Sequence, residues 1–99
     1  MTSKQRAYLK GLAMNIVPVF QIGKSSLTPE ITQAVDEALE ASELIKITVL
    51  KNWLDDGRSI AEVLAERTHS QVVQVIGRKI VLYRPAKDET KRKIVLPEK

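Results

Sequence analysis

The sequence predicts an α+β fold, an open sandwich in which three helices pack on a four-stranded mixed sheet. Two strand-like apolar segments each follow a segment with helical spacing, and a third helical segment leads into two consecutive strands. Those strands read QVVQVIGRKIVLYR, in which Gly77-Arg78 is a glycine-first pair suited to a tight type II′ turn. A helix between two strands allows them to pair in parallel, whereas a tight hairpin joins antiparallel strands, so the combination predicts a mixed sheet.

The first helix and the first strand are predicted from the opening residues. Residues 2–16 carry an apolar stripe at helical spacing, with Thr2 or Ser3 as the N-cap. Pro18 ends the helix because it cannot donate a backbone hydrogen bond and disfavours helical geometry at the residue before it. The apolar run at 19–22 is then a short strand.

The second helix and second strand have the clearest signals. Thr28-Pro29-Glu30 joins a hydroxyl cap, a first-position proline and an acid in the first turn, which predicts a helix start. Residues 43–50 are rich in β-formers and predict an interior strand with one face only partly covered. The residues expected to face the core on these two elements are Ile31, Ala34, Val35, Ala38, Leu39, Ile45, Ile47 and Val49.

The third helix is expected over residues 58–70, with either Asp56 or Ser59 as its cap, since Ser59 and Glu62 have capping-box spacing. Pro85 closes the last strand of the hairpin. We therefore expect one domain over residues 1–85, followed by a charged tail over 86–99. The tail either adds an edge strand or lies loosely.

Charge is distributed unevenly along the chain, whose formal net charge is +4. No acid precedes Glu30, five acids and no base lie between Glu30 and Glu43, and eight bases face three acids from Arg78 onward. Basic ends around an acidic helix suggest one positive face and a partner with phosphates, although a few surplus lysines also serve solubility alone. The absence of cysteine, signal-peptide pattern and membrane span favours a cytoplasmic protein without a membrane partner. We also expect a monomer.

Catalytic chemistry has little support in this sequence. The single histidine, His69, stands at a predicted helix end, where a structural or surface role is more common than general-base work. Asp55-Asp56 precede a glycine and fit a turn and a cap better than a metal site. No phosphate-binding P-loop or dinucleotide fingerprint is present. We expect no enzyme activity, cofactor or metal.

The stretch QIGKSSLTPE is the best candidate for a binding site. A strand that passes through Gly23 into a helix N-terminus brings free backbone N–H groups and a positive dipole end to one place. Gly23 permits close approach, Lys24 adds charge, and Ser25 and Ser26 offer hydroxyl donors. An ordinary turn between a strand and a helix is the alternative that the tetrapeptide alone leaves open.

Several segments together resemble the CRM domain, named for chloroplast RNA splicing and ribosome maturation, in its stand-alone bacterial YhbY-like form. They are KQRAYLKGLA, PVFQIGK before a helix, EALEASELIKI, and VVQVIGRKIVLYRP with the closing KRKIVLP. The resemblance implies a fold related to the C-terminal domain of translation initiation factor three. It also implies binding to structured RNA and association with precursors of the large ribosomal subunit.

The family loop has the pattern G-x-x-G, which corresponds here to Gly23, Lys24, Ser25 and Ser26, so Ser26 replaces the second glycine. A serine there either carries strain at a positive φ or narrows the cradle while adding a donor, and we favour the second reading. The alternative function is a protein-interaction module that docks through the acidic second helix or the tail. The candidate RNA-binding residues are Gly23, Lys24, Ser25, Ser26, Arg6 and Lys10, with Arg78, Lys79 and Arg84 as weaker members.

Overall fold

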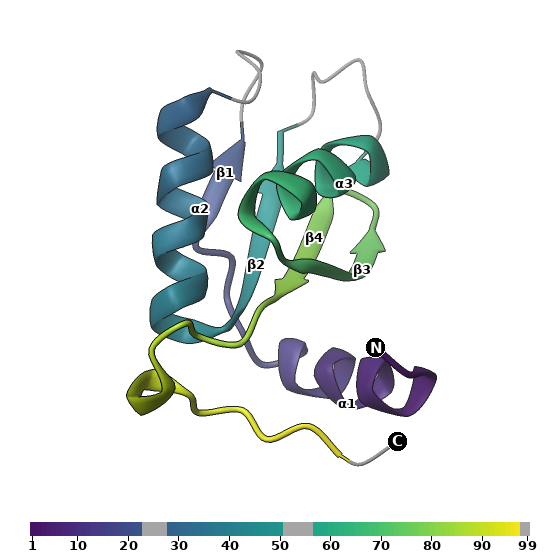
Figure 1. Cartoon of the computed structure of the whole chain (residues 1–99). Helices are drawn as coiled ribbons and strands as arrows, with labels where there is room; N and C mark the ends of the chain where they lie inside the picture. The colour runs from purple at the N-terminus through teal and green to yellow at the C-terminus, as the bar shows by residue number, and fades with distance from the viewer. Residues whose placement is uncertain (23–27, 51–56, 98–99) are drawn as a thin grey trace.

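The computed structural model describes residues 1–22, 28–50 and 57–97. In order along the chain, the described residues form the elements expected, and the predicted α+β architecture is confirmed (Figure 1). They are α1 (Ser3–Ala13), β1 (Phe20–Ile22), α2 (Pro29–Ser42), β2 (Leu44–Val49), α3 (Gly57–Thr68), β3 (Gln71–Ile76), β4 (Lys79–Tyr83) and a short 3₁₀ turn, η1 (Glu89–Lys91).

The sheet is mixed and its strand order is β1-β2-β4-β3. β1 pairs with β2 in parallel, and the other two pairings are antiparallel. In the hairpin, Ile76 lies opposite Lys79, which leaves Gly77 and Arg78 as a two-residue turn. Gly77 has a φ of 55° while Arg78 is not in the positive-φ region, as the predicted type II′ turn requires.

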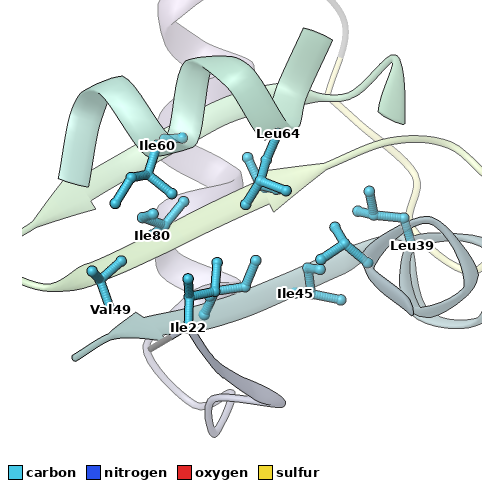
Figure 2. Close-up of a cluster of buried hydrophobic side chains, with 11 residues drawn as sticks. Ile22, Leu39, Ile45, Val49, Ile60, Leu64 and Ile80 are labelled. Carbon is cyan, nitrogen blue, oxygen red and sulfur yellow. The ribbon is translucent and has the colours of Figure 1, made fainter. Parts of the chain in front are cut away.

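The two faces of the sheet bury different clusters of apolar side chains. On one face, α2 and α3 pack over Ile45, Ile47, Ile80 and their neighbours (Figure 2). On the other face, α1 places Leu9 and Ala13 against a smaller cluster at one end of the sheet. Because side chains alternate along a strand, β2 and β4 each contribute to both clusters. The smaller cluster leaves part of the α1 side of the sheet uncovered.

Some of the helix ends were predictable from local sequence signals and others were not. Thr28 caps α2, as predicted, and of the two candidates for α1 it is Thr2 that caps the helix, in a full capping box with Gln5. The alternative that Ser59 caps α3 is wrong, because the helix already begins at Gly57; Asp56, the other candidate, lies outside the described residues. α3 ends with His69 at a φ of 56°, in a Schellman-type geometry that suits a helix terminus.

The segment after residue 85 is held against the domain. Ala86 is buried, and Ile94 and Leu96 pack on the cluster around Leu9. The side-chain amide of Gln5 donates to the carbonyl of Pro97 at 3.0 Å. Within residues 86–97 there is no strand, so this described part of the tail neither extends the sheet nor lies loosely. Among the described residues, no helix is long and apolar enough to cross a membrane.

Candidate functional site

The predicted phosphate-binding loop begins at one end of the sheet. There the Leu50 N–H donates to the Ile22 carbonyl at 2.9 Å, and the Val49 N–H donates to the Arg78 carbonyl at 2.7 Å. These two bonds place the end of β1, the end of β2 and the hairpin turn side by side. The start of α2 lies at this same end of the molecule (Figure 1).

The N-terminus of α2 combines free N–H donors and a positive dipole end with the carboxylate of Glu30 in its first turn. Thr28 Oγ1 accepts a hydrogen bond from the Ile31 N–H at 3.2 Å, which satisfies one of the free donors of the first turn. The aligned peptide dipoles of the helix leave a positive end here. Gly23, Lys24, Ser25 and Ser26 lie outside the described residues, and the structure describes their flanks, Ile22 and Thr28.

The basic candidates fall into two groups. Arg78 and Lys79 are exposed at the hairpin turn, beside the end of β2. Arg6 and Lys10 are exposed on α1, which lies toward the opposite end of the sheet from that turn (Figure 1). Arg6 and Lys10 are four residues apart and therefore share one side of the helix.

The uncovered strip of the sheet connects these two groups. One hollow of about 510 Å³ is bordered by Lys10 and Met14 of α1 and by Lys46, Gln74 and Ile76 of the strands. A second hollow of about 520 Å³ continues from Ile76 past Thr48 to Arg78 and Lys79. Lys46 was missed as a site residue. The alternation of side chains along the strand places Lys46 on a face that contains both apolar and polar residues. Only the packing of α1 shows that this face remains open beside Lys10.

Charge is separated by layer in the folded molecule. None of the residues of α1 or of the four strands is acidic, whereas these elements contain Lys4, Arg6, Lys10, Lys46 and Lys79. α2 contains four acids and no base, whereas α3 balances Glu62 and Glu66 with two arginines. The α1 side of the sheet therefore offers cations without neighbouring carboxylates, which is the pattern of a surface for a polyanion.

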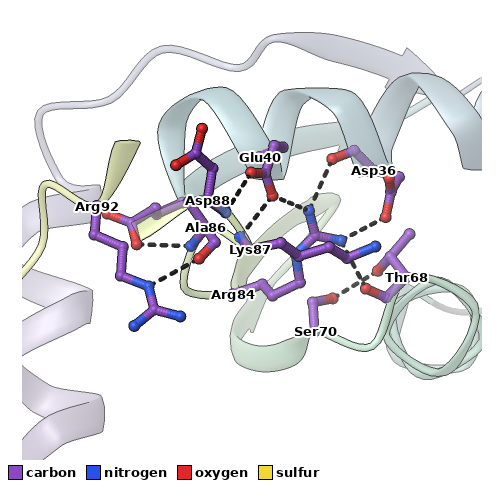
Figure 3. A network of polar contacts seen from close by, with 10 residues as sticks. Asp36, Glu40, Thr68, Ser70, Arg84, Ala86, Lys87, Asp88 and Arg92 are labelled. Atoms are coloured by element: carbon purple, nitrogen blue, oxygen red, sulfur yellow. Dashed lines mark hydrogen bonds and ion pairs between the residues drawn. The ribbon is translucent and has the colours of Figure 1, made fainter. Parts of the chain in front are cut away.

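Arg84, a weaker candidate from the sequence, lies inside the molecule and is only 5% exposed. Its guanidinium pairs with the carboxylates of Asp36 at 2.5 Å and Glu40 at 3.3 Å (Figure 3). It also donates to the Thr68 carbonyl at 3.0 Å. Arg84 thus ties β4 to α2 and to the end of α3, and it adds no charge to the open strip.

Two carboxylates of α2 and its C-terminus hold the tail. Glu40 accepts from the N–H groups of Lys87 and Asp88, and these bonds, chiefly that of Asp88, hold its pKa below the usual value. Glu43 is fully buried and accepts from the N–H groups of Ala86, Lys93 and Ile94. Burial by itself raises the pKa of Glu43, but these three backbone donors outweigh it and the pKa is lowered.

The arrangement can bind an anion by charge, by helix-terminal N–H groups and by polar side chains on the strip. In the part of the chain that the structure describes, no three His, Cys, Asp or Glu side chains are grouped as metal ligands. The accessible groups of the strip are ammonium, guanidinium, amide and hydroxyl donors. These suit recognition of phosphate and sugar.

The architecture defines a small α+β domain whose mixed sheet lies between one helix and a pair of helices. The chain belongs to the CRS1/YhbY (CRM) domain family, whose family model matches residues 1–84. The resemblance read from the sequence is thereby confirmed.

Relatives are similar over nearly their whole length. The chain is 41% identical over 97 residues to YqeI of Bacillus subtilis, named a probable RNA-binding protein, covering 98% of this chain and 99% of YqeI. It is 35% identical over 99 residues to a Haemophilus influenzae protein named an RNA-binding protein, covering 100% and 97% of the two chains. The solution structure of Staphylococcus aureus SAV1595 has a TM-score of 0.79 and 46% identity, covering 98% of this chain and 99% of that one.

Proposed function

We propose that this protein binds RNA through the α1 side of its sheet and the end of the sheet where β1 ends and the hairpin turn lies, with β2 between them. The observation that carries the proposal is the separation of charge by layer, with an acid-free α1 and sheet opposite the acidic α2, while α3 has equal numbers of acids and bases. A phosphate backbone is attracted to the acid-free elements and repelled by α2. The names of the relatives, which call them RNA-binding proteins, support the same partner.

In this proposal, Gly23, Lys24, Ser25 and Ser26 hold a backbone phosphate beside the N-terminus of α2. Arg78 and Lys79 extend that contact, and Arg6 and Lys10 add a second group of cations. Arg84 is left out because it is buried and both of its terminal nitrogens are engaged inside the molecule. Three or four phosphate contacts correspond to a slope of about −2 to −3 in a log–log plot of affinity against salt.

The RNA that we propose is ribosomal RNA in precursors of the large ribosomal subunit, bound by a cytoplasmic monomer without catalysis. Membership of the CRM family supports this assignment. Because a few phosphate contacts give weak binding alone, the shape of a folded RNA has to supply specificity.

A protein-interaction module is the alternative, and the structure gives it less support. Of the acids of α2, Asp36 and Glu40 are engaged with Arg84, and Glu40 also binds the tail. In the tail, Ile94 and Leu96 pack against the domain. Both surfaces proposed for protein docking are therefore partly used within the chain.

RNA affinity of single variants tests the proposal. We expect Lys24→Ala, Arg6→Ala and Arg78→Ala each to weaken binding to a large-subunit ribosomal RNA transcript and to flatten its salt dependence by about 0.7. Lys91→Ala is the matched control, because Lys91 is exposed near the acidic side chains of Glu40 and Asp88. Binding that is unchanged in both Arg6→Ala and Lys24→Ala would contradict the positive-surface proposal.

The ribosomal assignment has its own test. The protein is expected to migrate with large-subunit precursors on a low-salt density gradient, and ultraviolet crosslinking should join it to their ribosomal RNA. Migration with free small RNAs only would leave RNA binding in place and remove the ribosomal assignment.

A further inference from the structure

The uncovered strip of the sheet has features that the phosphate loop does not explain. It runs from Lys10 on α1, across Lys46, Gln74 and Ile76, to Lys79 beside the hairpin turn. We propose that an unpaired RNA strand crosses this strip, with Lys46 as its central phosphate contact. The inference rests on the proposed RNA-binding function and names the form of RNA and the surface that takes it.

The charges on the strip lack protein partners. Within the described part of the chain, the side chains of Lys10, Lys46, Arg78 and Lys79 make no hydrogen bond or ion pair. Thr48 lies opposite Lys79 in the sheet register, so Lys46 and Lys79 are diagonal neighbours on one face, with their Cα atoms about 7–8 Å apart. Two like charges on neighbouring side chains repel each other, and a bound anion between them would relieve the repulsion.

The uncharged side chains of the strip distinguish a single strand from a duplex. Ile76 is 60% exposed and Met14 is 82% exposed, although both lie between cations. An RNA duplex presents phosphates and 2′-hydroxyls to a protein, whereas an unpaired segment also presents the faces and edges of its bases. Apolar contact with Met14 and Ile76, and hydrogen bonds from Gln74 and Thr48, therefore suit unpaired nucleotides.

The strip also has a direction. One end lies beside α1 and the other reaches the turn at Arg78, whose carbonyl accepts from Val49 next to the end of β1. An RNA strand that contacts Arg78 and Lys79 at the turn thus continues across Lys46 toward Lys10. The two groups of cations that the sequence predicted separately would contact one continuous RNA segment.

Binding of two labelled RNAs by the full chain tests this inference. The probes are an RNA hairpin with a wide unpaired loop and a fully paired duplex of equal length, followed by fluorescence anisotropy over a salt series. The wild type is expected to prefer the looped RNA. Lys46→Gln should weaken that binding roughly 3- to 10-fold and flatten the salt slope by about 0.7. Lys91→Gln, the control, should change neither quantity.

The outcomes separate this inference from the proposed function. If the wild type binds neither RNA, the proposed function and this inference are both wrong. If the wild type binds the looped RNA but Lys46→Gln has no more effect than Lys91→Gln, the protein binds RNA elsewhere than on the strip. If the wild type binds the duplex and the looped RNA with equal affinity, the inference that the bound RNA is unpaired is wrong.

Crosslinking checks the strip without altering its cations. A photoreactive amino acid replaces Ile76 on the strip or, as the control, Val63, an exposed apolar residue of α3 on the other side of the sheet. Adducts with the looped RNA are expected from position 76 and not from position 63. In a cell extract, adducts from position 76 that contain protein instead of RNA would overturn the inference in favour of a protein partner.

Discussion

The backbone N–H of Ile94 donates to Oε1 of Glu43 at 2.9 Å, which joins the C-terminal segment to the turn between α2 and β2. Glu43 is a non-glycine residue with a φ of 66°, a conformation that costs about 1–3 kcal/mol. Its carboxylate also accepts from the N–H groups of Ala86 and Lys93. These three bonds to chain segments far away in sequence offset the unfavourable backbone.

Glu43→Gln should therefore destabilise the protein by about 2 kcal/mol, because an amide cannot accept all three bonds and buries unpaired N–H donors. Chemical denaturation monitored by circular dichroism measures the change. Glu37→Gln on the exposed side of α2 is the control and should stay within about 0.5 kcal/mol of the wild type. Equal stability of the two variants would mean that Glu43 does not anchor the tail.

Stability should also fall in acid because of the same carboxylate. The pKa of Glu43 is lowered from 4.5, since its backbone hydrogen bonds outweigh the effect of burial, and the pKa of Glu40 is lowered in the same direction. Between the folded and unfolded pKa values the unfolded chain binds more protons, so this stabilisation is complete above the unfolded value and is lost as the pH falls through the folded one. Urea unfolding from pH 7 to pH 3 should show the loss below about pH 4.5. The loss should be smaller in Glu43→Gln.

Arg84→Lys should destabilise the protein by about 3 kcal/mol. The guanidinium of Arg84 reaches two carboxylates and the Thr68 carbonyl from a buried position, and a single ammonium group cannot reproduce that geometry. The control is Arg78→Lys, because Arg78 is exposed and should change the free energy of unfolding by less than about 0.5 kcal/mol. Thermal unfolding of both variants provides the measurement. A loss in Arg84→Lys no larger than in Arg78→Lys would show that the network contributes nothing.

The fold was predictable because its signals are local. Thr28-Pro29 and the Gly77-Arg78 pair each specify a helix start or turn within a few residues, and both are confirmed. The role of Arg84 was not predictable, because its partner Asp36 is 48 residues away and both lay on positions that looked solvent-exposed in the helical and strand patterns. Glu43, the last acid of the run that begins at Glu30, is likewise absent from the residues that the pattern predicts for the core, yet it is fully buried. Buried charge pairs depend on tertiary contacts, which periodicity does not encode.

The candidate site was predictable in part for a similar reason. Runs of charge along the chain predicted a positive surface, and two of them coincide with single elements, the acid-free run with α1 and the acidic run with α2. The basic run from Arg78 onward is divided among the hairpin turn, the buried Arg84 and the tail. Lys46 was not among the predicted site residues because it is a single base in an apolar strand. Its exposure depends on where α1 stops covering the sheet, near Leu44 and Val81.

Two glycines with equally open surroundings should respond to alanine in opposite directions. An added Cβ would meet no atom within 4 Å at either Gly11 or Gly77. Gly11 lies inside α1, so Gly11→Ala should stabilise by about 0.5–1 kcal/mol. Gly77 has a φ of 55°, so Gly77→Ala should destabilise by about 1–2 kcal/mol through backbone strain alone. Unfolding free energies of both variants, compared with the wild type, provide the test, and a shift of the same sign in both would contradict it.

Ser26→Gly restores the glycine that the family loop has at its second position, and two measurements together reveal what serine does there. If that position requires a positive φ, the glycine should raise stability by about 1–3 kcal/mol and tighten RNA binding. If instead the hydroxyl donates to phosphate, stability should change little while RNA affinity falls. We expect the second result. Ser25→Gly is the matched control, because it gives the loop the same additional backbone freedom at the neighbouring position. An affinity and a stability that both stay at the wild-type values would mean that residue 26 does not approach the RNA.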